Sequence, residues 1–181
     1  SKLKDMQDTL PIHFAPLQGY TEAIYRNAHD AFFGGVDTYY TPFVRLEKGN
    51  FRRRDVRGIE PENNGVTHLI PQLIASSAEK AEVILSLFIE KGYQEVDINL
   101  GCPFPLLAKR HNGSGILPYP EEVKALLSIV TRYPQISFSV KMRLGWEQPD
   151  ECLALAPILN DLPLRQITMH PRLGKQGYKG E

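Results

Sequence analysis

Short apolar runs alternate with segments whose apolar residues recur at helical spacing, and this alternation continues along the chain. The short runs are rich in β-branched and aromatic side chains and predict strands at 11–17, 36–43, 67–75, 94–100, 136–145 and 165–172. The helix-period segments, several of which end at Gly or Pro, predict helices at 21–33, 76–92, 119–134 and 149–162. The turn-rich stretch 47–65 predicts a helical turn and an exposed loop.

Six strands that alternate with helices predict an α/β fold with a parallel sheet. A doubly wound sheet and a (β/α)8 TIM barrel both fit this pattern, but no strand is followed by the G-x-G-x-x-G sequence of a dinucleotide-binding fold. Polar residues instead follow successive strands, and a barrel gathers all its strand C-termini around one mouth. These residues are Gln18, Gln72, Asn99, Cys102, Lys141, Arg143, His170 and Arg172.

The predicted barrel is incomplete, because a full one needs about 250 residues and this sequence has 181. We therefore interpret residues 1–181 as one domain, the N-terminal portion of a barrel that stops after its sixth strand. Such a piece is expected to bind a phosphate-bearing cofactor weakly or not at all, since the last barrel loops frequently carry the phosphate site.

Composition narrows the class of protein only slightly. Basic and acidic residues number 21 each, and this balance disfavours an autonomous nucleic-acid binder, which is usually basic. Two cysteines suit a reducing compartment, and the charged N-terminus does not look like a signal peptide. With no long apolar run for a membrane span and no metal-ligand spacing, we expect a cytoplasmic protein without a metal.

Each candidate residue also has a structural interpretation. Cys102 could be a small buried hydrophobe, His170 a core histidine, and Lys141 half of a salt bridge. Their convergence on one mouth favours chemistry instead. A lysine with neutral amides would suit an aromatic heterocycle that becomes anionic, such as a reduced flavin. Because an unperturbed thiol has a pKa of about 8.5, Cys102 could donate a proton at neutral pH.

The motifs that contain these residues resemble the tRNA-dihydrouridine synthases, a family of FMN enzymes with the TIM-barrel fold. The resemblance runs from "FAPLQGYTEAIYRN" through "PQLIAS", "VDINLGCPFPLLAKRHNGSGIL" and "FSVKMRLGW" to "MHPRLGKQGYKG". The Asn-x-Gly-Cys-Pro motif at 99–103, followed by the Gly-x-Gly element at 113–115, is its most specific part.

The resemblance implies a role for each matching position. FMN would contact Ala15, Pro16, Leu17, Gln18, Gln72, Lys141 and His170. Cys102 corresponds to the family's general acid, and Asn99, Arg143 and Arg172 to substrate-binding positions. By the same resemblance NADPH reduces FMN, the flavin passes hydride to C6 of a uridine in tRNA, and Cys102 protonates C5.

Two alternatives stay open at this level. Related Asn…Cys-Pro sequences occur in flavin barrels that act on a free pyrimidine, and a truncated barrel could survive as a non-catalytic interaction module. Leu17 also stands where most members of the family have methionine, which is a mild change between apolar side chains.

Overall fold

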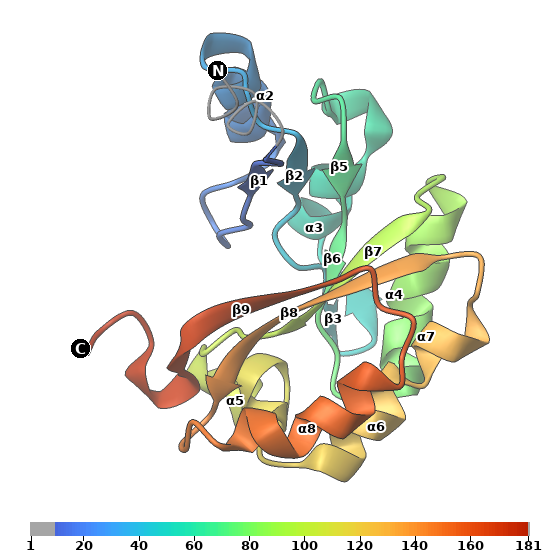
Figure 1. Cartoon of the computed structure of the whole chain (residues 1–181). Coiled ribbons are helices and arrows are strands. Elements are labelled where there is room, and N and C mark those ends of the chain that lie inside the picture. The colour runs from blue at the N-terminus through green and yellow to red at the C-terminus, as the bar shows by residue number, and fades with distance from the viewer. Residues whose placement is uncertain (1–9, 181) are drawn as a thin grey trace.

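A computed structural model describes residues 10–180 and shows six parallel strand positions in sequence order (Figure 1). The first sheet has the order β1 (His13–Phe14), β2 (Thr38–Tyr40) and β5 (Leu69–Ile70). The second has the order β6 (Gln72–Leu73), β7 (Glu95–Leu100), β8 (Ser137–Gly145) and β9 (Gln166–Leu173). Neighbours along the chain are neighbours in the sheet, as in a TIM barrel, so the predicted fold class is confirmed.

Pro71 joins the two sheets. A proline has no N–H for a ladder hydrogen bond, so the strand expected at 67–75 is two short strands. β5 pairs with β2 and β6 pairs with β7, while the Pro71 carbonyl accepts from the Asp97 amide at 3.0 Å. The six strand positions therefore form one continuous wall.

The predicted helices are present with shifted ends. They are α2 (Ala23–Phe32), α4 (Ala78–Glu90), α6 (Pro120–Leu127), α7 (Ile129–Arg132) and α8 (Glu151–Asn160). Ser77 caps α4, because its hydroxyl accepts from the Lys80 amide at 3.3 Å. The single helix expected over 119–134 is wrong: Ser128 ends α6, and α7 forms a separate turn.

Residues 47–65 contain more structure than the sequence predicted. A hairpin of β3 (Leu46–Glu47) and β4 (Asn50–Phe51) turns at Lys48 and Gly49, both in the left-handed backbone region. The helix α3 (Arg53–Ile59) and the 3-10 turn η1 (Pro61–Asn63) follow. Three other short elements lie near the carboxyl ends of the strands: α5 (Pro105–Ala108), η2 (Gly113–Ile116) and η3 (Gly174–Gln176).

The core lies between the long strands and the helices α4, α6 and α8, which Figure 1 shows along one face of β7 to β9. Strand alternation points Val96, Ile98 and Leu100 toward this core. The opposite face carries Asp97 and Asn99, whose partners across the ladder are Ser139 and Lys141. The inner face of the wall is therefore polar, and this places the candidate residues together. Within residues 10–180, no helix is both long and apolar enough to cross a membrane.

Candidate active site

A cavity of about 60 Å³ lies at the carboxyl ends of the strands, and we call it the mouth cavity. Nine of the residues expected at the site line it: Pro16, Leu17, Gln18, Gln72, Asn99, Cys102, Lys141, Arg143 and His170. Ala15 and Arg172 do not line it. Sequence reasoning missed Pro42, Phe43 and Tyr178, of which only Tyr178 lay inside a quoted motif.

A chain of hydrogen bonds runs from the barrel interior to Cys102. The Gln72 amide nitrogen donates to Asp97 at 2.7 Å, and the Asn99 amide nitrogen donates to the Gln72 oxygen at 2.9 Å. The Asn99 oxygen accepts from the backbone amides of Gly101 and Cys102 at 3.0 and 2.9 Å. Asp97 was also missed, although a carboxylate in the middle of an apolar strand was a visible signal.

The backbone around Cys102 is also held from the other side. Its carbonyl accepts from the Ser114 amide at 3.0 Å and from the Ser114 hydroxyl at 2.9 Å. Gly113 has φ of 58°, and a Cβ there would lie 2.6 Å from the same carbonyl. Glycine is required at 113 because both the close approach and the left-handed backbone exclude a side chain.

Burial raises the pKa of the Cys102 thiol above its usual range. A backbone hydrogen bond from Phe104 and the positive charges of Arg143 and Lys141 oppose this shift, but burial is the larger effect. Cys102 is therefore a protonated thiol at neutral pH, as a proton donor requires.

Lys141 and His170 line the cavity from the neighbouring strands β8 and β9. Burial lowers the pKa of the Lys141 ammonium, and the nearby Asp97 carboxylate partly offsets that effect. Burial also lowers the pKa of His170, and the positive charges of Arg143, Lys141 and Arg172 lower it further. His170 is thus a neutral imidazole near pH 7, able to donate from one nitrogen and accept at the other.

The two arginines expected to bind substrate occupy different places. Arg143 is 1% exposed, and its Nη1 donates to the carbonyls of Leu173 and Gly177 at 3.0 and 2.6 Å. Its guanidinium also lies 5.4 Å from the centre of the Tyr178 ring. Arg172 donates to the Gly180 carbonyl at 3.2 Å. Arg143 therefore holds the turn that brings Tyr178 to the cavity.

A groove of about 750 Å³, which we call the outer groove, shares lining residues with the mouth cavity, among them Leu17, Cys102 and Tyr178. Five aromatic side chains line it, namely Tyr20, Phe43, Phe104, Trp146 and Tyr178. Four basic side chains join them, namely Arg45, Arg52, Lys175 and Lys179. Three of these four pair with carboxylates: Arg45 with Glu47, Arg52 with Asp55, and Lys175 with Glu147. The outer groove therefore offers a ligand mainly aromatic surface, because most of its basic side chains are already paired.

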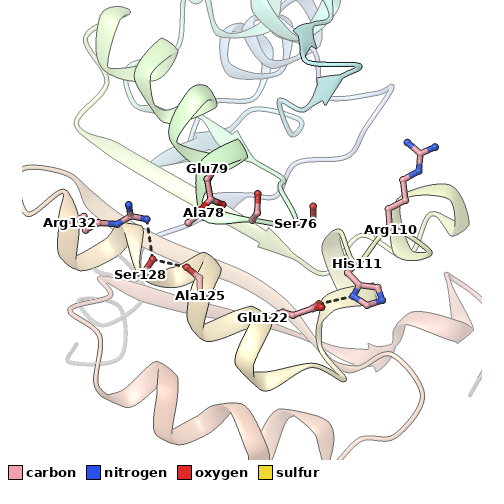
Figure 2. A pocket seen from close by; sticks show the side chains of 10 residues that line it. Ser76, Ala78, Glu79, Arg110, His111, Glu122, Ala125, Ser128 and Arg132 are labelled. Atoms are coloured by element: carbon pink, nitrogen blue, oxygen red, sulfur yellow. Dashed lines mark hydrogen bonds and ion pairs between the residues drawn. The ribbon is translucent and has the colours of Figure 1, made fainter.

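A separate pocket of about 560 Å³ lies between the start of α4 and the helices α6 and α7 (Figure 2). None of the expected site residues lines it. Its charges are partly satisfied internally, because His111 pairs with Glu122 at 2.6 Å and Arg132 donates to the Ser128 hydroxyl at 3.1 Å. This pocket does not contribute to the candidate site. In the described part of the chain, no cluster of three His, Cys, Asp or Glu side chains could hold a metal ion.

Comparison with known proteins gives the family of this chain. The family model described as dihydrouridine synthase matches residues 13–181. The chain belongs to the dihydrouridine synthase family. The match covers every strand of the wall and every residue of the mouth cavity.

Curated relatives of this family carry matching names. A probable tRNA-dihydrouridine synthase 1 from Synechocystis sp. is 29% identical over 173 residues, covering 92% of this chain and 46% of that protein. The tRNA-dihydrouridine(16) synthase of Haemophilus ducreyi is 28% identical over 180 residues, covering 94% and 54%. The tRNA-dihydrouridine synthase B of Vibrio cholerae is 32% identical over 112 residues, covering 61% and 33%. The chain spans about half the length of the first and second of these relatives.

Proposed function

We propose that this protein reduces uridine to 5,6-dihydrouridine in tRNA, with FMN as its cofactor and NADPH as the electron donor. The observation that carries the proposal is the mouth cavity, where a thiol, three side-chain amides, an ammonium and an imidazole meet in a chain of the dihydrouridine synthase family. The names of the curated relatives support tRNA as the substrate.

The residues of the cavity fit a flavin ring. The side-chain oxygen of Gln18 is buried and has no hydrogen-bond partner within residues 10–180, so it needs a donor from a bound group. Lys141 on β8 and the second side-chain N–H of Gln72 on β6 would offer donors from the same sheet. A flavin ring edge carries both an N–H and carbonyl oxygens, which matches this mixed set. The backbone at Ala15, Pro16 and Leu17 and the imidazole of His170 would complete the contacts.

When bound there, FMN supplies the hydride that adds to C6 of the pyrimidine. Cys102 then gives its thiol proton to C5, which completes the addition of two hydrogen atoms across the C5–C6 bond. Asn99 holds the backbone of the thiol, and the Lys141 ammonium favours negative charge that develops in the cavity. Arg143 on β8 would act on the substrate indirectly, through the turn that carries Tyr178. Arg172 on β9 would contact the substrate outside the mouth cavity.

The outer groove supports a polynucleotide substrate over a free pyrimidine. Aromatic side chains stack on unpaired bases with little dependence on sequence. A uridine must leave its stack to reach a recessed thiol, and Cys102 lines the outer groove together with its five aromatic side chains. A free pyrimidine would have no use for this surface.

The proposed function predicts a selective defect in the Cys102→Ala variant. Reduction of uridine in tRNA should fall by about 10² to 10⁴, the usual loss for a general acid, while NADPH-driven flavin reduction continues. The measurement is dihydrouridine per tRNA by mass spectrometry, alongside anaerobic flavin bleaching. Cys152→Ala is the matched control, because Cys152 on α8 lies outside the cavity. Uridine reduction at the wild-type rate in Cys102→Ala would remove the thiol from the mechanism.

A further inference from the structure

The hydrogen-bond chain that ends at Cys102 begins at Asp97, a side chain 2% exposed on the inner face of β7. One carboxylate oxygen accepts from Gln72 at 2.7 Å, and the other accepts from the Ser139 hydroxyl at 2.6 Å. Asp97 does not line the mouth cavity. It reaches the site only through Gln72 and Asn99.

The chemistry of these groups gives the chain one direction. Burial raises the pKa of Asp97, while the hydrogen bonds from Gln72 and Ser139 and the charges of Lys141 and Arg165 favour its ionised form. The carboxyl oxygen that faces Gln72 accepts a hydrogen bond, so Gln72 turns its NH2 toward Asp97. The Gln72 oxygen then faces Asn99, which must donate its own NH2. The Asn99 oxygen is left to accept from Gly101 and Cys102. The backbone donors at the Cys102 end and the Asp97 oxygen at the other end therefore fix the orientation of both amides.

We propose that Asp97 is a positioning residue: as the terminal acceptor of this chain it holds the amides of Gln72 and Asn99 in one orientation, and so holds the Cys102 backbone. This inference rests on the proposed function only for the chemical importance of Cys102 and Gln72. Without an acceptor at position 97, the buried Gln72 NH2 is left unsatisfied and turns away, which releases the Asn99 NH2 as well.

The test compares three variants of nearly constant size. Asp97→Leu removes the acceptor. Asp97→Asn keeps one, because its oxygen can face Gln72 while its NH2 donates to the Ser139 hydroxyl. Ser139→Ala keeps the carboxylate and removes its other partner. The readouts are hydrogen exchange of the Gly101 and Cys102 amides and the iodoacetamide reaction of Cys102, with Cys152 as the reference thiol in the same chain.

Asp97→Leu should speed amide exchange and alkylation at Cys102 by about tenfold, because a buried hydrogen-bond network has lost its acceptor. Asp97→Asn and Ser139→Ala should stay within about threefold of wild type. Amide exchange in α4 and alkylation of Cys152 should stay unchanged in all three variants. These two controls distinguish a local loosening of the Cys102 backbone from a general loss of stability. Folded Asp97→Leu protein with wild-type exchange and alkylation at Cys102 would overturn the proposal.

If Asp97→Leu does not fold, the double variant Asp97→Asn with Ser139→Ala replaces it. The introduced side-chain NH2 at position 97 then has no hydroxyl to bind, and it turns toward Gln72 and opposes another donor. The proposal is supported if the double variant speeds amide exchange and alkylation at Cys102 by about tenfold, which is more than the product of the two single-variant effects. Rates equal to that product refute it. These readouts need neither flavin nor tRNA. A wild-type protein that makes no dihydrouridine would therefore refute the proposed function and leave this inference standing.

Discussion

Cys102 is held between two opposing electrostatic effects. Burial favours the neutral thiol, while the nearby Arg143 and Lys141 favour the thiolate. The balance keeps the thiol protonated at neutral pH, yet leaves a positive environment for the thiolate that remains after proton transfer. A serine in this position would be a far weaker acid.

The first residue-scale prediction concerns pH. Because the pKa of Cys102 is raised, its alkylation rate should keep increasing above the pH at which an exposed thiol reaches its plateau. Lys141→Met removes a charge that lowers this pKa, so the profile should move to still higher pH. The alkylation rate of Cys102 by iodoacetamide, followed by mass spectrometry at a series of pH values, gives the profile of the wild type and of Lys141→Met. A shift to lower pH in Lys141→Met would contradict this account.

The second residue-scale prediction concerns Arg143. Its bonds to the carbonyls of Leu173 and Gly177 require the guanidinium fork. Arg143→Lys should therefore lower the free energy of unfolding by about 2 kcal/mol, the value of a lost charged hydrogen bond. Urea denaturation measures the change. The matched control is Arg172→Lys, with one contact to Gly180, which should stay within about 0.5 kcal/mol.

At the scale of elements, the turn η2 is packed against the loop that carries Cys102. The glycines at 113 and 115 form the Gly-x-Gly element of the family resemblance. The structure places them against protein backbone: a Cβ at Gly115 would lie 2.2 Å from the Ala108 carbonyl oxygen of α5. The two glycines let α5, η2 and the Cys102 loop form one rigid unit, and this contact was not readable from the sequence.

The element-scale prediction is a pair of glycine substitutions. Gly115→Ala should destabilise the fold by about 1–3 kcal/mol, because the added methyl group overlaps backbone that cannot move aside. Gly58→Ala is the control, since Gly58 lies in α3 and a Cβ there meets nothing within 4 Å. The control should be neutral or stabilising by up to about 1 kcal/mol. Thermal unfolding of both variants gives the comparison, and equal melting temperatures would show that the η2 contact can relax.

At the scale of the whole molecule, the wall of strands has two edges, β1 and β9, in the described residues. β9 presents Ile167 and Met169, which are 42% and 40% exposed. An exposed apolar edge strand is a template for pairing with a second chain.

A polypeptide of residues 1–181 is therefore expected to self-associate as its concentration rises. Ile167→Lys should reduce this association, because a charge on an edge strand opposes pairing. Light scattering over a concentration series measures the effect. Ile24→Lys is the control, since Ile24 on α2 is 85% exposed but lies away from the strand edge. Equal effects of the two substitutions would indicate general hydrophobic association in place of edge pairing.

The sequence alone predicts the order of strands and helices and the residue types at the strand ends. Both follow from local patterns, namely apolar spacing, glycine and proline stops, and polar residues after each strand. The motif around Cys102 also indicated the family, which the comparison confirmed. The assigned roles of the site residues remain predictions.

How those residues are held depends on contacts that exist only in the folded chain. The break at Pro71, the end of α6 at Ser128 and the β3–β4 hairpin depend on partners distant in sequence or on local competition that periodicity does not resolve. The role of Asp97 depends on Gln72, 25 residues earlier, and on Ser139, 42 residues later. Hydrogen bonds between neighbouring strands join residues that no local pattern connects, and so the support of the site became visible only in three dimensions.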